Sequence, residues 1–128
     1  MTKKRILMTK SFSRWLNKNN LNNHHLLDAI EEMDKGLIDA DLGCNLYKKR
    51  VRLSGAGKRS GARIIVATKF LKRWYLIFGF AKNERSNISG DELLSLQEVA
   101  KRLLHLCERE VDTAINAKQL EEIKIDEK

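Results

Sequence analysis

The residues best suited to chemistry in this 128-residue chain are cationic and lie in its middle. Residues 43–90 carry 12 lysines and arginines against a single acid, Glu84, although the whole chain holds 25 basic and 17 acidic side chains. Within this stretch Lys48, Arg50 and Arg52 occupy alternate positions of an expected strand, so they share one of its faces. Successive members of that row lie about 6–7 Å apart, close to the phosphate spacing of one nucleic-acid strand. This charge pattern favours an anionic partner, rich in phosphate or carboxylate groups.

Two further cations lie where neighbouring strands would bring them together. Arg63 opens an expected strand at residues 62–70, and Lys82 follows another at residues 73–81. In an antiparallel hairpin the start of one strand and the end of its partner meet at the same edge of the sheet. Long cationic side chains that simply protect a sheet edge would explain the alternating row. They explain the convergence of Arg63 with Lys82 less well, so we predict a basic site built from several strands.

The sequence lacks the usual equipment of hydrolases and nucleotide-binding enzymes. Residues 43–90 contain no histidine, and the chain has no HExxH motif. Residues 54–63, "SGAGKRSGAR", lack the spacing of a phosphate-binding Walker loop, and a strand rather than a helix is expected after them. We interpret them as a basic loop whose Lys58 and Arg59 contact a polyanion.

Phosphodiester transfer in RNA is a reaction that cationic side chains alone can assist. The RNA supplies its own nucleophile, the 2′-hydroxyl, and the protein orients it and neutralises the phosphate. Closely packed cations also lower the pKa of a lysine, which makes that lysine usable as a base. We therefore expect a site that uses no metal and no cofactor.

The expected scaffold is a single α+β domain over residues 1–118, followed by a polar tail at residues 119–128. A Ser-x-x-Glu capping box at Ser89–Glu92 starts the last and longest helix. The segments between strands are too short for parallel crossovers, so the three central strands are expected to be antiparallel. In chain order the predicted elements are a strand at 4–9, helices at 10–19 and 22–36, strands at 45–53, 62–70 and 73–81, and a helix from 90 to about 115.

The chain has the composition of a globular protein rather than a disordered one. It is 42% hydrophobic, with a net charge of +8 and a pI of about 9.7. Its apolar runs are too short to cross a bilayer, and its first residues lack the apolar core of a signal peptide. We expect a cytoplasmic location and no membrane partner.

Four segments resemble the RelE/ParE superfamily of type II toxins, and within it the HigB/Gp49-like branch. They are "EEMDKGLIDADLG" (31–43), "RVRL" (50–53), "GARIIVA" (61–67) and "FAKNERSNIS" (80–89). The resemblance spans roughly residues 8–108. It implies a small curved antiparallel sheet flanked by two N-terminal helices and one long C-terminal helix.

The resemblance also implies a function and a set of site residues. The expected activity is that of a metal-independent, ribosome-dependent mRNA endoribonuclease (an mRNA interferase) that leaves 2′,3′-cyclic phosphate ends. The expected partners are mRNA on the ribosome and a cognate antitoxin. The expected catalytic residues are Arg63, Lys82, Arg85, Arg52 and Lys49, with Lys82 or Lys49 moving the proton. The expected RNA- and phosphate-binding residues are Lys48, Arg50, Lys58, Arg59, Tyr47 and Asn83.

The sequence departs from the family pattern at two positions and leaves alternatives open. Asn83 stands where relatives have an arginine, and Ser89 stands where they have a tyrosine. Tyr47 could supply the missing stacking from another strand. One alternative is a relative without nuclease activity, either a ParE-like inhibitor of DNA gyrase or an inactive prophage protein that binds nucleic acid. Another is a basic structural protein of the ribosome, which fits the charge but not a single ordered site.

Overall fold

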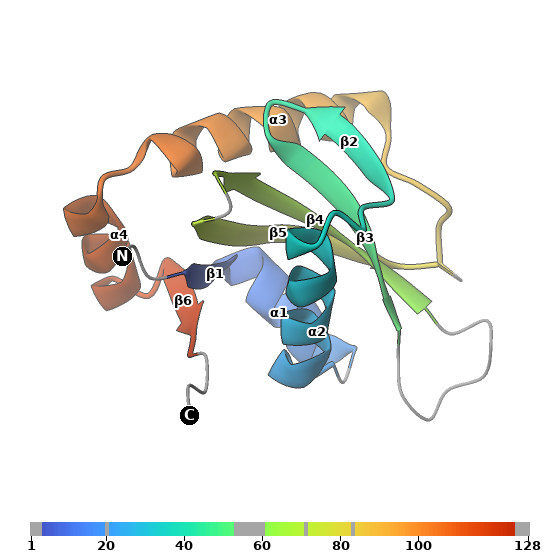
Figure 1. The fold of residues 1–128 in the computed structure, drawn as a ribbon, viewed down its shortest axis with the longest axis horizontal. Helices are drawn as coiled ribbons and strands as arrows, with labels where there is room; N and C mark the ends of the chain where they lie inside the picture. The colour runs from blue at the N-terminus through green and yellow to red at the C-terminus, as the bar shows by residue number, and fades with distance from the viewer. Residues whose placement is uncertain (1–3, 20, 53–60, 71, 83, 125–128) are drawn as a thin grey trace.

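A six-stranded sheet forms the centre of the computed structural model, which describes residues 4–19, 21–52, 61–70, 72–82 and 84–124 (Figure 1). Its strand order is β2-β3-β4-β5-β1-β6. The antiparallel pairing of β3, β4 and β5 is confirmed, and β1 lies parallel to β5, so the sheet is mixed. The elements are β1 (Arg5–Thr9), α1 (Lys10–Lys18), α2 (Asn23–Asp34), β2 (Ala40–Gly43), β3 (Leu46–Arg52), β4 (Gly61–Lys69), β5 (Arg73–Ala81), α3 (Gly90–His105), α4 (Glu108–Asn116) and β6 (Leu120–Ile123).

Helices cover both faces of the sheet, and each face has its own hydrophobic core (Figure 1). On one face α1 and α2 pack on alternate strand residues such as Ile64 and Trp74. On the other face α3 and α4 pack on the intervening residues, among them Ile65 and Tyr75. Burying a large apolar side chain contributes about 1.5–3 kcal/mol to stability. Because both faces of the central strands are covered, consecutive residues of these strands are apolar. The α+β prediction is confirmed.

The C-terminal region contains two helices where one long helix was expected. At Leu106 the backbone is extended, and the N–H of Cys107 donates to Glu110 Oε1 at 2.8 Å, which caps a new helix. Arg73 Nη1 holds the break by donating to the Leu106 carbonyl oxygen at 2.7 Å. The apolar stripe continues across the break to the buried Val111, so the periodicity of the sequence conceals it.

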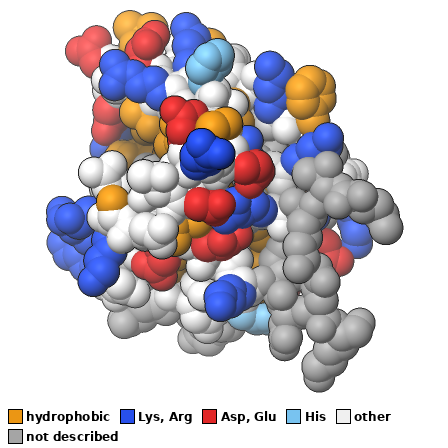
Figure 2. Space-filling view, turned by 90° about the vertical axis from the view of Figure 1, so that its left-hand side faces the viewer, with side chains coloured by type: hydrophobic (Ala, Val, Ile, Leu, Met, Phe, Trp, Pro, Cys, Tyr) orange, Lys and Arg blue, Asp and Glu red, His pale blue; other side chains and the backbone are white. Residues whose placement is uncertain are grey.

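Two short edge strands, β2 and β6, were not expected. We expected residues 119–128 to be a polar tail, whereas Leu120–Ile123 pair antiparallel with β1 and bury Leu120 and Ile123. Arg5 of β1 stabilises this edge of the sheet through side-chain hydrogen bonds. Its guanidinium donates to both carboxylate oxygens of Glu122 at 2.9 Å and also reaches Glu108 and Asp112 of α4. Figure 2 views the molecule from this side and shows acidic and basic side chains intermixed across its middle.

A bulge in β5 decides which side chains reach the α3 face. Ile65 pairs with Phe78 but the next residue, Val66, pairs with Leu76, so Ile77 is an extra residue on β5. A bulge of this kind reverses the alternation of side chains along the strand. Phe78 therefore lies on the same face as Tyr75. Gly79 consequently faces α1, where a Cβ would come within 2.5 Å of the Trp15 ring.

Candidate nucleic-acid interface

Strand register brings two arginines of the expected site together. Arg50 of β3 is the direct partner of Arg63 of β4, and Arg63 is the direct partner of Phe80 of β5. Directly paired residues of neighbouring strands point to the same face of the sheet. Ile65, two residues after Arg63 on β4, packs in the core beneath α3, so Arg63 points to that face as well. Arg50, Arg63 and Phe80 therefore form a row across three strands on the α3 face.

Arg63 is the most enclosed of these cations. Only 15% of its side chain is exposed, and its Nε lies 3.5 Å from Asp39 Oδ2. Its Nη1 is buried and has no hydrogen-bond partner among the described residues. A buried donor without an acceptor costs about 1–3 kcal/mol, more when the group is charged. The guanidinium of Arg63 thus retains one hydrogen-bond donor that no described acceptor satisfies.

The segment after β5 folds back over this row. The N–H of Lys82 donates to the Gly61 carbonyl oxygen at 3.0 Å, which ties the end of β5 to the start of β4. The N–H of Arg85 then donates to the Ala81 carbonyl oxygen at 3.2 Å and closes a turn. The convergence of Arg63 and Lys82 at one edge of the sheet, predicted from the hairpin, is present in the backbone.

Arg85 lies on an aromatic platform. Its Cζ is 5.8 Å from the ring centroid of Phe78 and 5.6 Å from that of Phe80. Its guanidinium is also held from the helix side, because Nη1 donates to Glu92 Oε2 at 3.1 Å and Nη2 donates to Oε1. The platform and the carboxylate together fix the plane of the guanidinium beside Phe80, the aromatic partner of Arg63.

Glu92 links this cation to the start of α3. Its Oε1 accepts the N–H of Ser89 at 2.8 Å, and its own N–H donates to Ser89 Oγ at 3.1 Å, which confirms the predicted capping box. The hydrogen bonds from Arg85, and then the N–H of Ser89, lower the pKa of Glu92 to about 2. The same pair raises the pKa of Arg85. Ser89 is therefore used as the N-cap of α3.

The remaining cations on this side are more open. Lys48 Nζ lies 3.5 Å from Asn87 Oδ1, whereas the side chains of Arg50 and Lys82 are exposed. We call Lys48, Arg50, Arg63, Lys82 and Arg85 the basic cluster. Within the described part of the chain, the carboxylates that pair with it are those of Asp39 and Glu92. The cluster therefore keeps a clear excess of positive charge.

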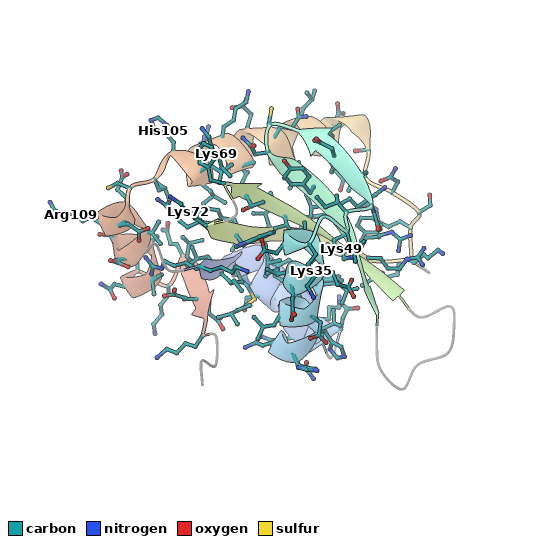
Figure 3. The ribbon with its side chains drawn as sticks, in the orientation of Figure 1. Lys35, Lys49, Lys69, Lys72, His105 and Arg109 are labelled. Atoms are coloured by element: carbon teal, nitrogen blue, oxygen red, sulfur yellow. The ribbon has the colours of Figure 1, made fainter. Side chains whose placement is uncertain are left out.

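Two expected site residues lie on the other face of the sheet. Lys49 is buried, with its Nζ 2.8 Å from Glu32 Oε1 on α2, and Figure 3 shows it on the α2 side of β3. Tyr47 is partly buried against the core beneath α1 and α2. Neither side chain shares a face with Arg63, because alternate residues of β3 point in opposite directions.

Four other expected residues fall wholly or partly outside the described structure. The backbone of Arg52 pairs with Gly61, but its side chain is not among those described. Lys58, Arg59 and Asn83 lie outside the described residues. Their expected roles stay predictions.

A cavity beside the basic cluster has a different character. It measures about 450 Å³ between α2 and β3, and its walls include both Lys49 and Arg50. Three carboxylates also line it, those of Asp28, Glu32 and Asp39. Because acids and cations are mixed in this cavity, it attracts a polyanion less than the α3 face, where the cations are in excess.

Sequence reasoning missed the acids and the rings that shape the cluster. Asp39 reaches Arg63 from a segment that precedes β2, and only the pairing of β2 with β3 brings it there. Phe78 and Phe80 face Arg85 because of the β5 bulge, which has no signal in the sequence. The sequence predicts Glu92 only as a capping residue, and it carries no signal for the ion pair with Arg85.

Two other kinds of functional feature are absent from the described residues. No group of three or more histidine, cysteine, aspartate or glutamate side chains there is arranged to hold a metal ion. None of the helices described is long and apolar enough to span a membrane.

The fold and the basic cluster define a small α+β protein with a cationic site on one face of its sheet. Comparison with known families matches residues 4–123 to the RelE toxin of the RelE/RelB toxin–antitoxin system. The chain belongs to this family of toxins, whose members generally pair with a cognate antitoxin. The resemblance to the RelE/ParE superfamily is confirmed, and the HigB/Gp49-like branch stays a prediction. A search of curated proteins found no match.

Proposed function

We propose that this toxin is a ribosome-dependent endoribonuclease that cleaves mRNA at the basic cluster. The 2′-oxygen of the RNA attacks the adjacent phosphorus, a bond forms between them, and the bond from phosphorus to the 5′-oxygen breaks. The products are a 2′,3′-cyclic phosphate and a 5′-hydroxyl. The 2′-hydroxyl loses one proton and the leaving 5′-oxygen gains one, so the protein needs to orient the RNA, move a proton and stabilise negative charge.

The observation that carries this proposal is the state of Arg63. Its guanidinium is largely buried, pairs only loosely with Asp39 and retains an orphaned Nη1 among the described atoms. A phosphate would supply the missing acceptor and would relieve the repulsion between Arg63 and Arg50. Arg85 would stabilise charge on the same phosphate from the platform of Phe78 and Phe80.

Lys82 is our candidate for proton transfer. Its ammonium is exposed and forms no ion pair with a described residue, whereas that of Lys49 is buried against Glu32 on the other face. Arg52, next on the row after Arg50, would extend the contact along the RNA backbone. The antitoxin would neutralise the toxin by covering the basic cluster with an acidic or amphipathic segment.

The alternative is a toxin that binds without cutting. It is favoured by the pairing of Arg85 with Glu92 and by the use of Ser89 as a helix cap where relatives carry a tyrosine. In that case the basic cluster would hold a nucleic acid, or the protein would act on DNA gyrase as ParE-type relatives do.

Inducible expression in a bacterium separates these functions. Primer extension on several mRNAs and a DNA supercoiling assay would be run on the same cultures, with Arg63→Ala as the test variant. Arg14→Ala, which removes an exposed arginine from α1, is the matched control. Cuts inside translated codons that Arg63→Ala abolishes and Arg14→Ala retains would support the nuclease. Intact mRNA with altered supercoiling would support gyrase inhibition instead.

A further inference from the structure

The turn between β4 and β5 presents an aromatic side chain to solvent. Phe70 is 78% exposed, more than any other large hydrophobic residue described. It lies at the end of β4 opposite to Arg63, about 20 Å away along the strand. The side chain therefore belongs neither to a core nor to the basic cluster.

Phe70 also has a backbone conformation that disfavours it. Its φ is +59°, in the left-handed region where glycine and asparagine are the residues usually found. A phenylalanine there adds backbone strain and gains no burial in return. Folding alone would favour a smaller or more polar residue, which suggests that the ring serves binding.

One lysine contacts the ring, and other basic side chains lie nearby. Lys69 Nζ lies 5.4 Å from the ring centroid of Phe70, and Lys72 follows in the same turn. An adjacent cavity of about 340 Å³ is lined by Lys69, by Lys101 and His105 of α3, and by Cys44, Asn45 and Leu104. Figure 3 shows Lys69 and His105 at the C-terminal end of α3, with Lys72 below them in the turn that precedes β5.

The acids near these cations are already engaged. Glu98 lies 3.5 Å from Lys101, and Glu108 pairs with Arg5 and Arg73. The carboxylate of Glu110 accepts the N–H of Cys107. No described carboxylate lies within ion-pair distance of Lys69 or Lys72, whereas His105 interacts electrostatically with Glu110 of α4.

We propose that Lys69, Phe70, Lys72, Lys101 and His105 form a second RNA-binding surface, the Phe70 surface. An unpaired base would stack on the Phe70 ring, and the flanking phosphates would contact the lysines. Exposed aromatic rings between cations bind single-stranded nucleic acid in this way, because every base has a π-face. The proposal rests on the proposed function only for its choice of RNA as the polyanion. An acidic peptide would use the cations but has no comparable need for the ring.

Binding to RNA without a ribosome tests this surface. Fluorescence anisotropy would use a fluorescein-labelled single-stranded RNA of about 12 nucleotides and Arg63→Ala protein, so that cleavage does not interfere. Adding Phe70→Ala should weaken binding about tenfold, as expected when one stacked base loses its platform. Leu94→Ala is the matched control, since Leu94 is 63% exposed on α3 away from the turn, and it should bind like its parent.

Two further variants distinguish stacking from a general attraction to anions. Phe70→Gly relieves the left-handed strain, so it should unfold at the same or a higher temperature than the parent while still binding RNA weakly. Lys69→Gln with Lys72→Gln should reduce the slope of log affinity against log salt by about 1.4, because each lysine that neutralises a phosphate of a single strand accounts for about 0.7 of that slope. Binding of Phe70→Gly equal to that of the parent would overturn the proposal.

A competition experiment addresses the other class of partner. Polyglutamate with the same number of negative charges as the RNA would be used as the competitor. It should displace the RNA no better from the parent, which retains Phe70, than from the Phe70→Ala variant. If polyglutamate displaced the RNA more readily from the parent than from Phe70→Ala, the proposal would be overturned in favour of an acidic protein partner. The nuclease is tested by mRNA cleavage in cells with and without Arg63→Ala, whereas the Phe70 surface is tested by RNA binding in vitro. Either proposal can therefore fail while the other holds.

Discussion

Arg50 and Arg63 lie directly opposite each other on neighbouring antiparallel strands and share the face beneath α3. Like charges in this arrangement destabilise a sheet, and Asp39 offsets only part of the charge on Arg63. A fold selected only for stability would place a neutral residue at one of these two positions. Under the proposed function, the two arginines are kept side by side because together they bind an anion, and the stability of the rest of the domain offsets their repulsion.

Replacing Arg50 should raise stability while it lowers activity. Arg50→Thr removes the cation opposite Arg63 and keeps a residue suited to a strand, so the free energy of unfolding should rise by about 0.2–1 kcal/mol at low salt. The gain should shrink at high salt, because the repulsion is screened. Urea unfolding at two salt concentrations measures the first effect, and primer extension measures the loss of cleavage. A variant that is less stable at both salt concentrations would contradict this view of the pair.

The pair formed by Arg85 and Glu92 should make stability depend on pH in the acid range. The folded pKa of Glu92 is about 2, below the ordinary value of 4.5 expected when the chain is unfolded. The unfolded chain therefore binds more protons at intermediate pH, and the contribution of Glu92 is full above about pH 4.5 and is lost as the pH falls toward 2.

Glu92→Gln provides the measurement. Thermal unfolding between pH 5 and pH 2.5, as an approximate range set by those two pKa values, should show a smaller loss of stability on acidification for the variant than for the parent. Glu98→Gln on the exposed side of the same helix is the control, and it should follow the parent. Identical pH profiles for Glu92→Gln and the parent would show that the pair does not contribute.

Lys49→Met should leave mRNA cleavage intact. Lys49 is buried on the α2 face, and its partner Glu32 is about half exposed, so losing the lysine does not strand a charge in the interior. Because the carboxylate left behind is solvated, replacing the lysine by an apolar residue of similar length is expected to change stability little. Primer extension beside Lys82→Met gives the comparison. Loss of cleavage in a folded Lys49→Met protein would return Lys49 to the catalytic site.

The edge strand β6 should be necessary for stability. Leu120 and Ile123 are 5% and 3% exposed, so replacing either by alanine should cost about 2–5 kcal/mol. Lys124→Ala, at an exposed position next to the strand, is the control. Urea unfolding measures the difference. Truncation after Lys118 should be more damaging still, because it also removes Glu122 from the hydrogen bonds of Arg5.

The local features of this protein could be predicted from its sequence because they depend on neighbours in the chain. Alternation put Lys48 and Arg50 on one face and Lys49 on the other, and the order Ser89 to Glu92 indicated a helix cap. Charge counting located the cationic region. Each of these inferences uses the period of a strand or a helix, which residues a few positions apart already express.

The tertiary structure decided how those features meet. Sequence periodicity does not show that β1 inserts in parallel beside β5, that β6 closes that edge, or that Asp39 reaches Arg63. These contacts join residues far apart in the chain, and their stability depends on the packing of the whole sheet. The bulge at Ile77 is the sharpest case, because one extra residue turns Phe78 and Phe80 toward Arg85. The sequence by itself determined which residues are cationic and which strand face carries them, and only the fold decided which of them share a site.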